Sequence, residues 1–115
     1  MATCNSAQNA LCKKLGKDYR VCYIDLERCI YRDFGNGFNL EISCTHTTSK
    51  RKKAKLYLWF GECFIVRKVF GVAQEDIGAV AEERYEYTKL LIKQGYDNRE
   101  SLLDMLHPKF NEERN

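Results

Sequence analysis

The spacing of apolar residues changes at Arg20 and again at Gly71 in this chain of 115 residues, and these changes constrain the fold more than any other feature. Between Arg20 and Phe70 apolar and polar residues alternate in short runs, which is the two-residue period of β-strands. After Gly71 the apolar residues recur at steps of three and four, which is the period of an amphipathic helix. A run of strands followed by a run of helices predicts an α+β fold.

The turn sequences between the predicted strands favour an antiparallel meander. Residues 35–37 read Gly-Asn-Gly, a hairpin signal because both residue types adopt positive φ readily. Apolar and polar residues alternate over 38–44 and 54–60, which predicts two strands that each bury one face. Residues 20–34 form either two strands or one long strand with a bulge, and 63–70 are apolar on both faces apart from two cations. We therefore expect a sheet of four or five antiparallel strands.

Helices are predicted on both sides of the strand region in the sequence. A short helix ends near Gly16, and a long helix extends over about residues 75–94, where Gly95 supplies a left-handed C-terminal residue. Asn98 caps a further short helix, which Pro108 ends. We expect the two C-terminal helices to pack on the apolar face of the sheet. Neither a repeat nor a linker is visible in the sequence, so residues 1–115 are predicted to form a single compact domain.

The composition excludes several classes of protein. With 44% hydrophobic residues, seven glycines and one proline, the chain is too apolar to be disordered. Its longest apolar run is of strand length, well below the ~20 residues of a membrane helix, so no membrane contact is expected. The first residues lack the basic and apolar segments of a signal peptide. We therefore expect a cytoplasmic protein whose six cysteines are reduced.

The net charge of +3 is the balance of two oppositely charged regions. Residues 1–70 contain thirteen Lys and Arg against six Asp and Glu, whereas residues 71–115 contain six against ten. A net charge this small excludes a strongly basic protein, yet the division between the regions still permits a local phosphate-binding patch.

The densest basic segment of the chain is Lys50, Arg51, Lys52, Lys53 and Lys55. Such a segment attracts phosphates and makes binding dependent on salt. Tyr57 and Trp59 follow at alternate positions, on the same predicted side of the strand as Lys55, and exposed rings there can stack on bases. The other interpretation is a solvated loop with both rings packed against the protein.

Glutamates gather on the predicted long helix. Glu82, Glu83 and Glu86 fall opposite its apolar stripe, and we name these three residues the acidic ridge. An acidic ridge complements a basic protein groove that normally holds nucleic acid. The same pattern is also that of an ordinary solvated helix face.

Cysteine and histidine form only fragments of a catalytic or metal site. Cys44 and His46 are a Cys-x-His pair, and Cys63 can meet His46 if their strands are neighbours. No second close pair completes a tetrahedral metal site. We therefore predict no catalytic residue, no metal and no cofactor, and interpret the strand cysteines as small apolar residues.

In general character the chain resembles the small accessory proteins that phages and mobile elements encode, anti-CRISPR inhibitors among them. The shared features are small size, a single domain, reduced cysteines and the lack of catalytic motifs. The resemblance is one of type, and it assigns a role to no residue.

Three functions are compatible with these observations. The first is a non-enzymatic protein-binding module that inhibits a bacterial nucleic-acid enzyme and contacts it through the acidic ridge, Tyr57 and Trp59. The second is a small nucleic-acid-binding protein that uses Lys50–Lys55, and the third is a small Cys/His enzyme or metal protein. An unpaired edge strand also leaves a homodimer open.

Overall fold

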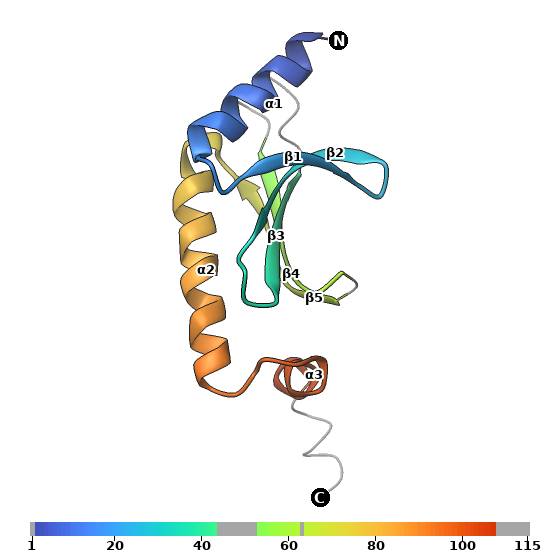
Figure 1. Ribbon diagram of the computed structural model, residues 1–115, viewed down its shortest axis with the longest axis vertical. Coiled ribbons are helices and arrows are strands. Elements are labelled where there is room, and N and C mark those ends of the chain that lie inside the picture. The colour runs from blue at the N-terminus through green and yellow to red at the C-terminus, as the bar shows by residue number, and fades with distance from the viewer. Residues whose placement is uncertain (1, 44–52, 63, 108–115) are drawn as a thin grey trace, which may run out of the picture.

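The computed structural model describes residues 2–43, 53–62 and 64–107, and it has an α+β fold. Five antiparallel strands form one sheet in which every strand pairs with its neighbour in sequence (Figure 1). The strands are β1 (Arg20–Ile24), β2 (Glu27–Asp33), β3 (Phe38–Ser43), β4 (Ala54–Phe60) and β5 (Phe64–Val72). The predicted meander is confirmed, with the larger of the two expected strand numbers.

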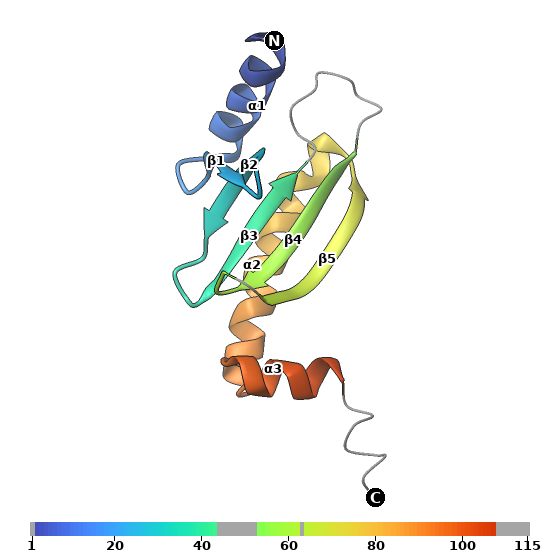
Figure 2. The same cartoon turned by 90° about the vertical axis from the view of Figure 1, so that its right-hand side faces the viewer.

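Within the described ranges, three α-helices flank the sheet. They are α1 (Ala2–Leu15), α2 (Ile77–Lys93), which follows a short 3-10 turn η1 (Gln74–Asp76), and α3 (Arg99–Leu106). Helix α2 runs along one face of the sheet, α1 lies at the end near β1 and β2, and α3 crosses the opposite end (Figures 1 and 2). The prediction of one short N-terminal helix and two C-terminal helices is therefore confirmed.

The core lies between α2 and the face of the sheet that it covers. Leu40 on β3 pairs with Leu58 on β4, and Ile42 pairs with Leu56, so the apolar positions of both strands share one face. All four are at most 1% exposed, as is Ala81 on the buried side of α2. Alternation in the strands and the three-to-four spacing in the helix thus produce two matching apolar surfaces.

The β2–β3 turn joins the sheet to α2. Asn36 donates from Nδ2 to Thr88 Oγ1 at 3.0 Å, while its own Oδ1 accepts from the Phe38 amide at 3.2 Å. Gly37 has a φ of 94°, and a Cβ there would lie 3.3 Å from the Phe60 ring. Only glycine therefore fits this position without moving the ring.

The β1–β2 hairpin resolves the alternative that the sequence left open over residues 20–34. Ile24 pairs with Glu27, so two residues, Asp25 and Leu26, connect two separate strands. Their φ values are 50° and 68°, and positive φ at both central residues is the property of a type I′ turn.

Helix α2 ends and helix α3 begins at the expected residues. Gly95 takes a φ of 92° after α2, and its amide donates to the Ile92 carbonyl at 3.0 Å. At the start of α3, Asn98 Oδ1 accepts from the Ser101 amide at 2.8 Å, and Ser101 Oγ accepts from the Asn98 amide at 3.4 Å. This is a reciprocal capping box.

Candidate functional site

The sheet has one face that no described helix crosses (Figures 1 and 2). Strand register places Tyr31, Glu41 and Tyr57 side by side on this face, opposite to the core residues. Trp59 lies two residues beyond Tyr57 and pairs with Asn39 on the same face. Tyr57 and Trp59 therefore occupy the outward side of β4 that the sequence predicted, and both are half-buried.

Glu41 is a buried carboxylate at the centre of this uncovered face. It is 7% exposed and accepts hydrogen bonds from Trp59 Nε1 at 3.0 Å and from Ser43 Oγ at 2.7 Å. These two donors satisfy the buried anion and fix the plane of the indole. The Trp59 N–H is thus used inside the protein, although the ring borders the surface.

A second group of side chains on this face forms what we name the β4–β5 cluster: Lys55, Tyr57, Lys68 and Phe70. The ammonium groups of Lys55 and Lys68 lie 5.4 and 5.9 Å from the centroid of the Phe70 ring. The Tyr57 ring meets Phe70 edge-on, with centroids 5.8 Å apart. Phe70 is nevertheless 54% exposed, so the cluster presents an aromatic ring and two cations to solvent.

A groove of about 700 Å³ lies between the β1–β2 hairpin and the turns that join β2 to β3 and β4 to β5. We name it the hairpin groove. Its polar and aromatic lining includes Arg20, Tyr31, Asp33, Trp59 and Glu62. The guanidinium carbon of Arg20 lies 5.0 Å from the Tyr31 ring centroid. Burial raises the pKa of the Tyr31 phenol, and the Asp33 carboxylate raises it further.

The tip of the β1–β2 hairpin exposes two large apolar side chains. Leu26 is 98% exposed and Tyr23 is 71% exposed. We name residues 23–27 the hairpin tip. Asp25 and Glu27 flank Leu26 in sequence, so the apolar tip carries acidic neighbours.

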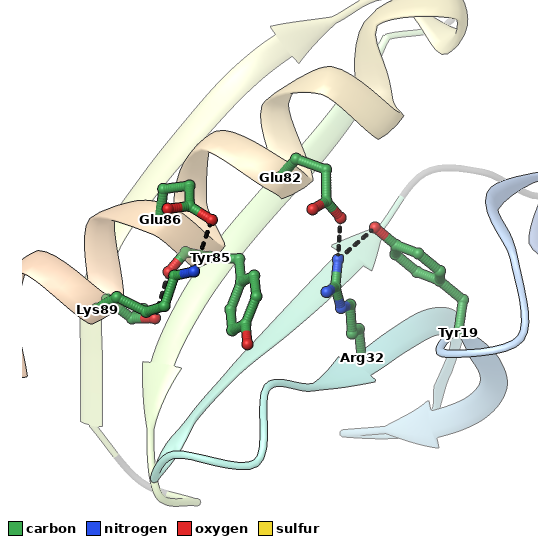
Figure 3. A network of polar contacts seen from close by, with 7 residues as sticks. Tyr19, Arg32, Glu82, Tyr85, Glu86 and Lys89 are labelled. Carbon is green, nitrogen blue, oxygen red and sulfur yellow. Dashed lines mark hydrogen bonds and ion pairs between the residues drawn. The ribbon is translucent and has the colours of Figure 1, made fainter.

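The first residue of the acidic ridge belongs to a network that joins the helix to the sheet (Figure 3). Arg32 extends from β2 to Glu82 on α2, and it also donates to the Tyr19 hydroxyl at 3.1 Å. Its guanidinium carbon lies 5.3, 5.0 and 4.9 Å from the ring centroids of Tyr19, Phe34 and Tyr85. Burial lowers the pKa of Arg32, but the hydrogen bonds with Glu82 and Tyr19 outweigh that effect and raise it.

The other two ridge residues also have cationic partners. Glu83 pairs with Arg84, and Glu86 Oε2 lies 2.9 Å from Lys89 Nζ. The side chains of Glu82, Glu83 and Glu86 are 61%, 63% and 64% exposed, so the ridge faces solvent. Because each carboxylate faces a cation, the ridge carries less uncompensated negative charge than its sequence indicates.

Several predicted residues lie outside the described part of the chain. These are Lys50, Arg51 and Lys52 of the basic segment, and Cys44, His46 and Cys63 of the possible Cys/His site. Lys53 is described and is exposed just before β4 begins. Of the basic segment, the structure therefore places only Lys53 and Lys55, and both are at the start of β4.

Two of the described cysteines, Cys12 and Cys29, occupy environments that suppress thiolate formation. Cys29 is fully buried and pairs with Cys22 across the β1–β2 ladder. Burial is the main cause that raises the pKa of the Cys29 thiol, and the neighbouring Cys22 raises it further. Burial also raises the pKa of the Cys12 thiol, although the nearby Arg28 acts to lower it. Raised thiol pKa values disfavour nucleophilic catalysis. In the described ranges no three His, Cys, Asp or Glu side chains gather as a metal site would require.

Tyr23, Leu26, Lys68 and Phe70 are among the residues of these surfaces that the sequence did not identify. The apolar character of both faces over residues 63–70 was a signal for Phe70, because a strand on a half-covered sheet exposes one of its faces. No comparable signal exists for Leu26, since Asp-Leu is not a recognised hairpin turn sequence.

No protein-family model matches the chain, and no curated protein or solved structure matches it either. None of the helices in the described part is both long and apolar enough to cross a membrane. The protein is thus a small α+β domain. One face of its sheet is covered by a helix, and the open face carries the hairpin groove and the β4–β5 cluster.

Proposed function

We propose that this protein is a non-enzymatic protein-binding module that contacts its partner through the hairpin tip and the adjoining hairpin groove. The observation that carries the proposal is Leu26, which is 98% exposed and has a φ of 68°. The left-handed conformation costs a residue such as leucine about 1 kcal/mol, and full exposure forgoes the burial of its side chain. Insertion of Leu26 into a pocket of a partner buries the side chain, and the free energy of this burial offsets the cost of the left-handed conformation.

The charges around the groove indicate the chemistry of the partner. Asp25, Asp33 and Glu62 line it together with one cation, Arg20, which lies against the Tyr31 ring. The complementary surface is an apolar pocket bordered by lysine and arginine. Basic surfaces of this kind occur on nucleic-acid enzymes, which supports the hypothesis of an inhibitor of anti-CRISPR type.

The hairpin groove is a better contact surface than the acidic ridge on electrostatic grounds. Each ridge carboxylate has a cation of its own within the protein. Its attraction for a basic partner is therefore weakened by the adjacent opposite charge. Trp59, which the sequence suggested as a partner contact, lines the groove and fits this surface as well.

The proposal is tested by changing the turn without changing the fold. Asp25→Asn combined with Leu26→Gly introduces the preferred type I′ turn sequence and removes the exposed leucine. We expect affinity capture from nuclease-treated bacterial lysate to recover a basic nucleic-acid enzyme with the unaltered protein. Recovery should fall at least tenfold with the double variant, the loss of about 1.4 kcal/mol expected for one apolar anchor.

Leu90→Asn is the matched control, because Leu90 is a 49% exposed leucine on α2, away from the hairpin. This variant should leave capture unchanged. Equal recovery with the unaltered protein and the turn variant contradicts the proposal. Recovery of nothing except further copies of this chain contradicts it too, because that result assigns the surface to a homodimer.

A further inference from the structure

The β4–β5 cluster is a second surface that the proposed protein contact does not use. We propose that it binds single-stranded nucleic acid, with Phe70 as the stacking platform for a base and with Lys55 and Lys68 as contacts to the phosphates on either side. This site is separate from the hairpin surface, and neither proposal depends on the other.

The geometry of Phe70 suits stacking. The ring is 54% exposed on a sheet face that no described helix crosses. Tyr57 packs against it in a T-shaped arrangement, with the centroids 5.8 Å apart and the ring planes at 68°, which restrains the ring. Aromatic side chains on an open sheet are a recurrent platform for unpaired bases, because every base has a stacking surface.

The charge of the two lysines is available to a ligand. Neither Lys55 nor Lys68 forms an ion pair with a carboxylate of the described ranges, where the ion pairs involve other cations. Glu41, the carboxylate on the same face, is occupied by Trp59 and Ser43. Both ammonium groups instead lie near the Phe70 ring. A base that stacks on the ring displaces them toward its own flanking phosphates, so weak cation–π contacts are exchanged for ion pairs.

The same geometry favours a single strand over other polyanions. In a duplex the faces of the bases are already stacked on one another, so they are not available to stack on Phe70. A lipid surface requires apolar side chains that project beyond the charged groups. Here the two ammonium groups lie over the Phe70 ring, within 6 Å of its centroid, so the ring does not project beyond them.

The test is fluorescence anisotropy with labelled twelve-nucleotide oligo-dT and oligo-U, at 50 and 200 mM salt. We expect binding that weakens with salt and that falls about tenfold in Phe70→Leu, whereas Phe70→Trp retains it. Lys55→Ala with Lys68→Ala should reduce the slope of log affinity against log salt by about 1.4, because each phosphate contact to a single strand contributes about 0.7.

Two controls separate this site from general charge and from the hairpin. Lys13→Ala with Lys14→Ala removes the same charge from exposed positions on α1 and should leave the slope unchanged. Tyr23→Ala removes an exposed ring from the hairpin tip and should leave oligonucleotide affinity unchanged. The proposal is overturned by the absence of binding at 50 mM salt, by an equal effect of the two double-lysine variants, or by binding to vesicles rich in phosphatidylserine without binding to either oligonucleotide.

Discussion

The exposed Glu82 contributes to the stability of the protein because its partner, Arg32, is buried. The Arg32 side chain is 9% exposed, whereas that of Glu82 is 61% exposed. Removal of Glu82 leaves a buried guanidinium without its counter-charge, which is more costly than the loss of a surface ion pair. The sequence placed Glu82 correctly on the solvated side of α2, but a pattern of period 3.6 carries no information about a partner fifty residues away.

We therefore predict unequal effects for two similar glutamates on one helix. Glu82→Ala should lower the free energy of unfolding by about 1–2 kcal/mol. Glu86→Ala, at a residue of nearly equal exposure whose partner Lys89 is on the surface, should change it within experimental error. Urea denaturation of the two variants makes the comparison. Equal losses would show that the Arg32 network contributes no more than an ordinary surface pair.

At the scale of single elements, the cap of α3 is the clearest determinant. We predict that Asn98→Ala lowers the free energy of unfolding by about 1 kcal/mol, because it leaves the Ser101 amide without its 2.8 Å acceptor. Ser101→Ala should be milder, since the reciprocal contact is longer, at 3.4 Å. Thermal unfolding followed by circular dichroism measures both. A larger effect of Ser101→Ala would contradict the assignment of Asn98 as the principal cap.

The elements also differ in how far the sequence could predict them. The β2–β3 turn was predictable because its two positive-φ positions, Gly35 and Gly37, are both glycine. The β1–β2 turn was not, because Leu26 adopts a positive φ against its own preference, and tertiary pairing of the strands decides. The cross-strand neighbours that build the β4–β5 cluster depend on register, which alternation alone does not specify.

For the molecule as a whole, the titration of buried groups predicts a loss of stability in alkali. Burial raises the pKa values of Cys12, Cys29, Tyr19 and Tyr31 above the ordinary 9.0 of cysteine and 10.0 of tyrosine. The unfolded chain releases these protons at lower pH than the folded protein does. The free energy of unfolding therefore keeps their full contribution below about pH 9 and declines as the pH rises beyond it. Each group contributes at most about 1.4 kcal/mol per pH unit.

Urea unfolding at intervals between about pH 8 and 11 checks this expectation. In Cys29→Ala, the free energy of unfolding should decline less steeply with rising pH, by up to about 1.4 kcal/mol per pH unit, which corresponds to one proton. This change in slope is independent of what the variant does to stability at neutral pH. A flat profile, or a slope that this variant leaves unchanged, would contradict the role assigned to the buried thiol.

The central claim is that the hairpin tip is shaped for contact with a partner and is not required by the fold. The most direct measurement is the melting temperature of the Asp25→Asn, Leu26→Gly variant beside the unaltered protein. We predict a rise of about 4 °C or more, since relief of left-handed strain at Leu26 gains roughly 1 kcal/mol. A melting temperature that is unchanged or lower would show that Leu26 stabilises the folded chain, and would contradict the claim.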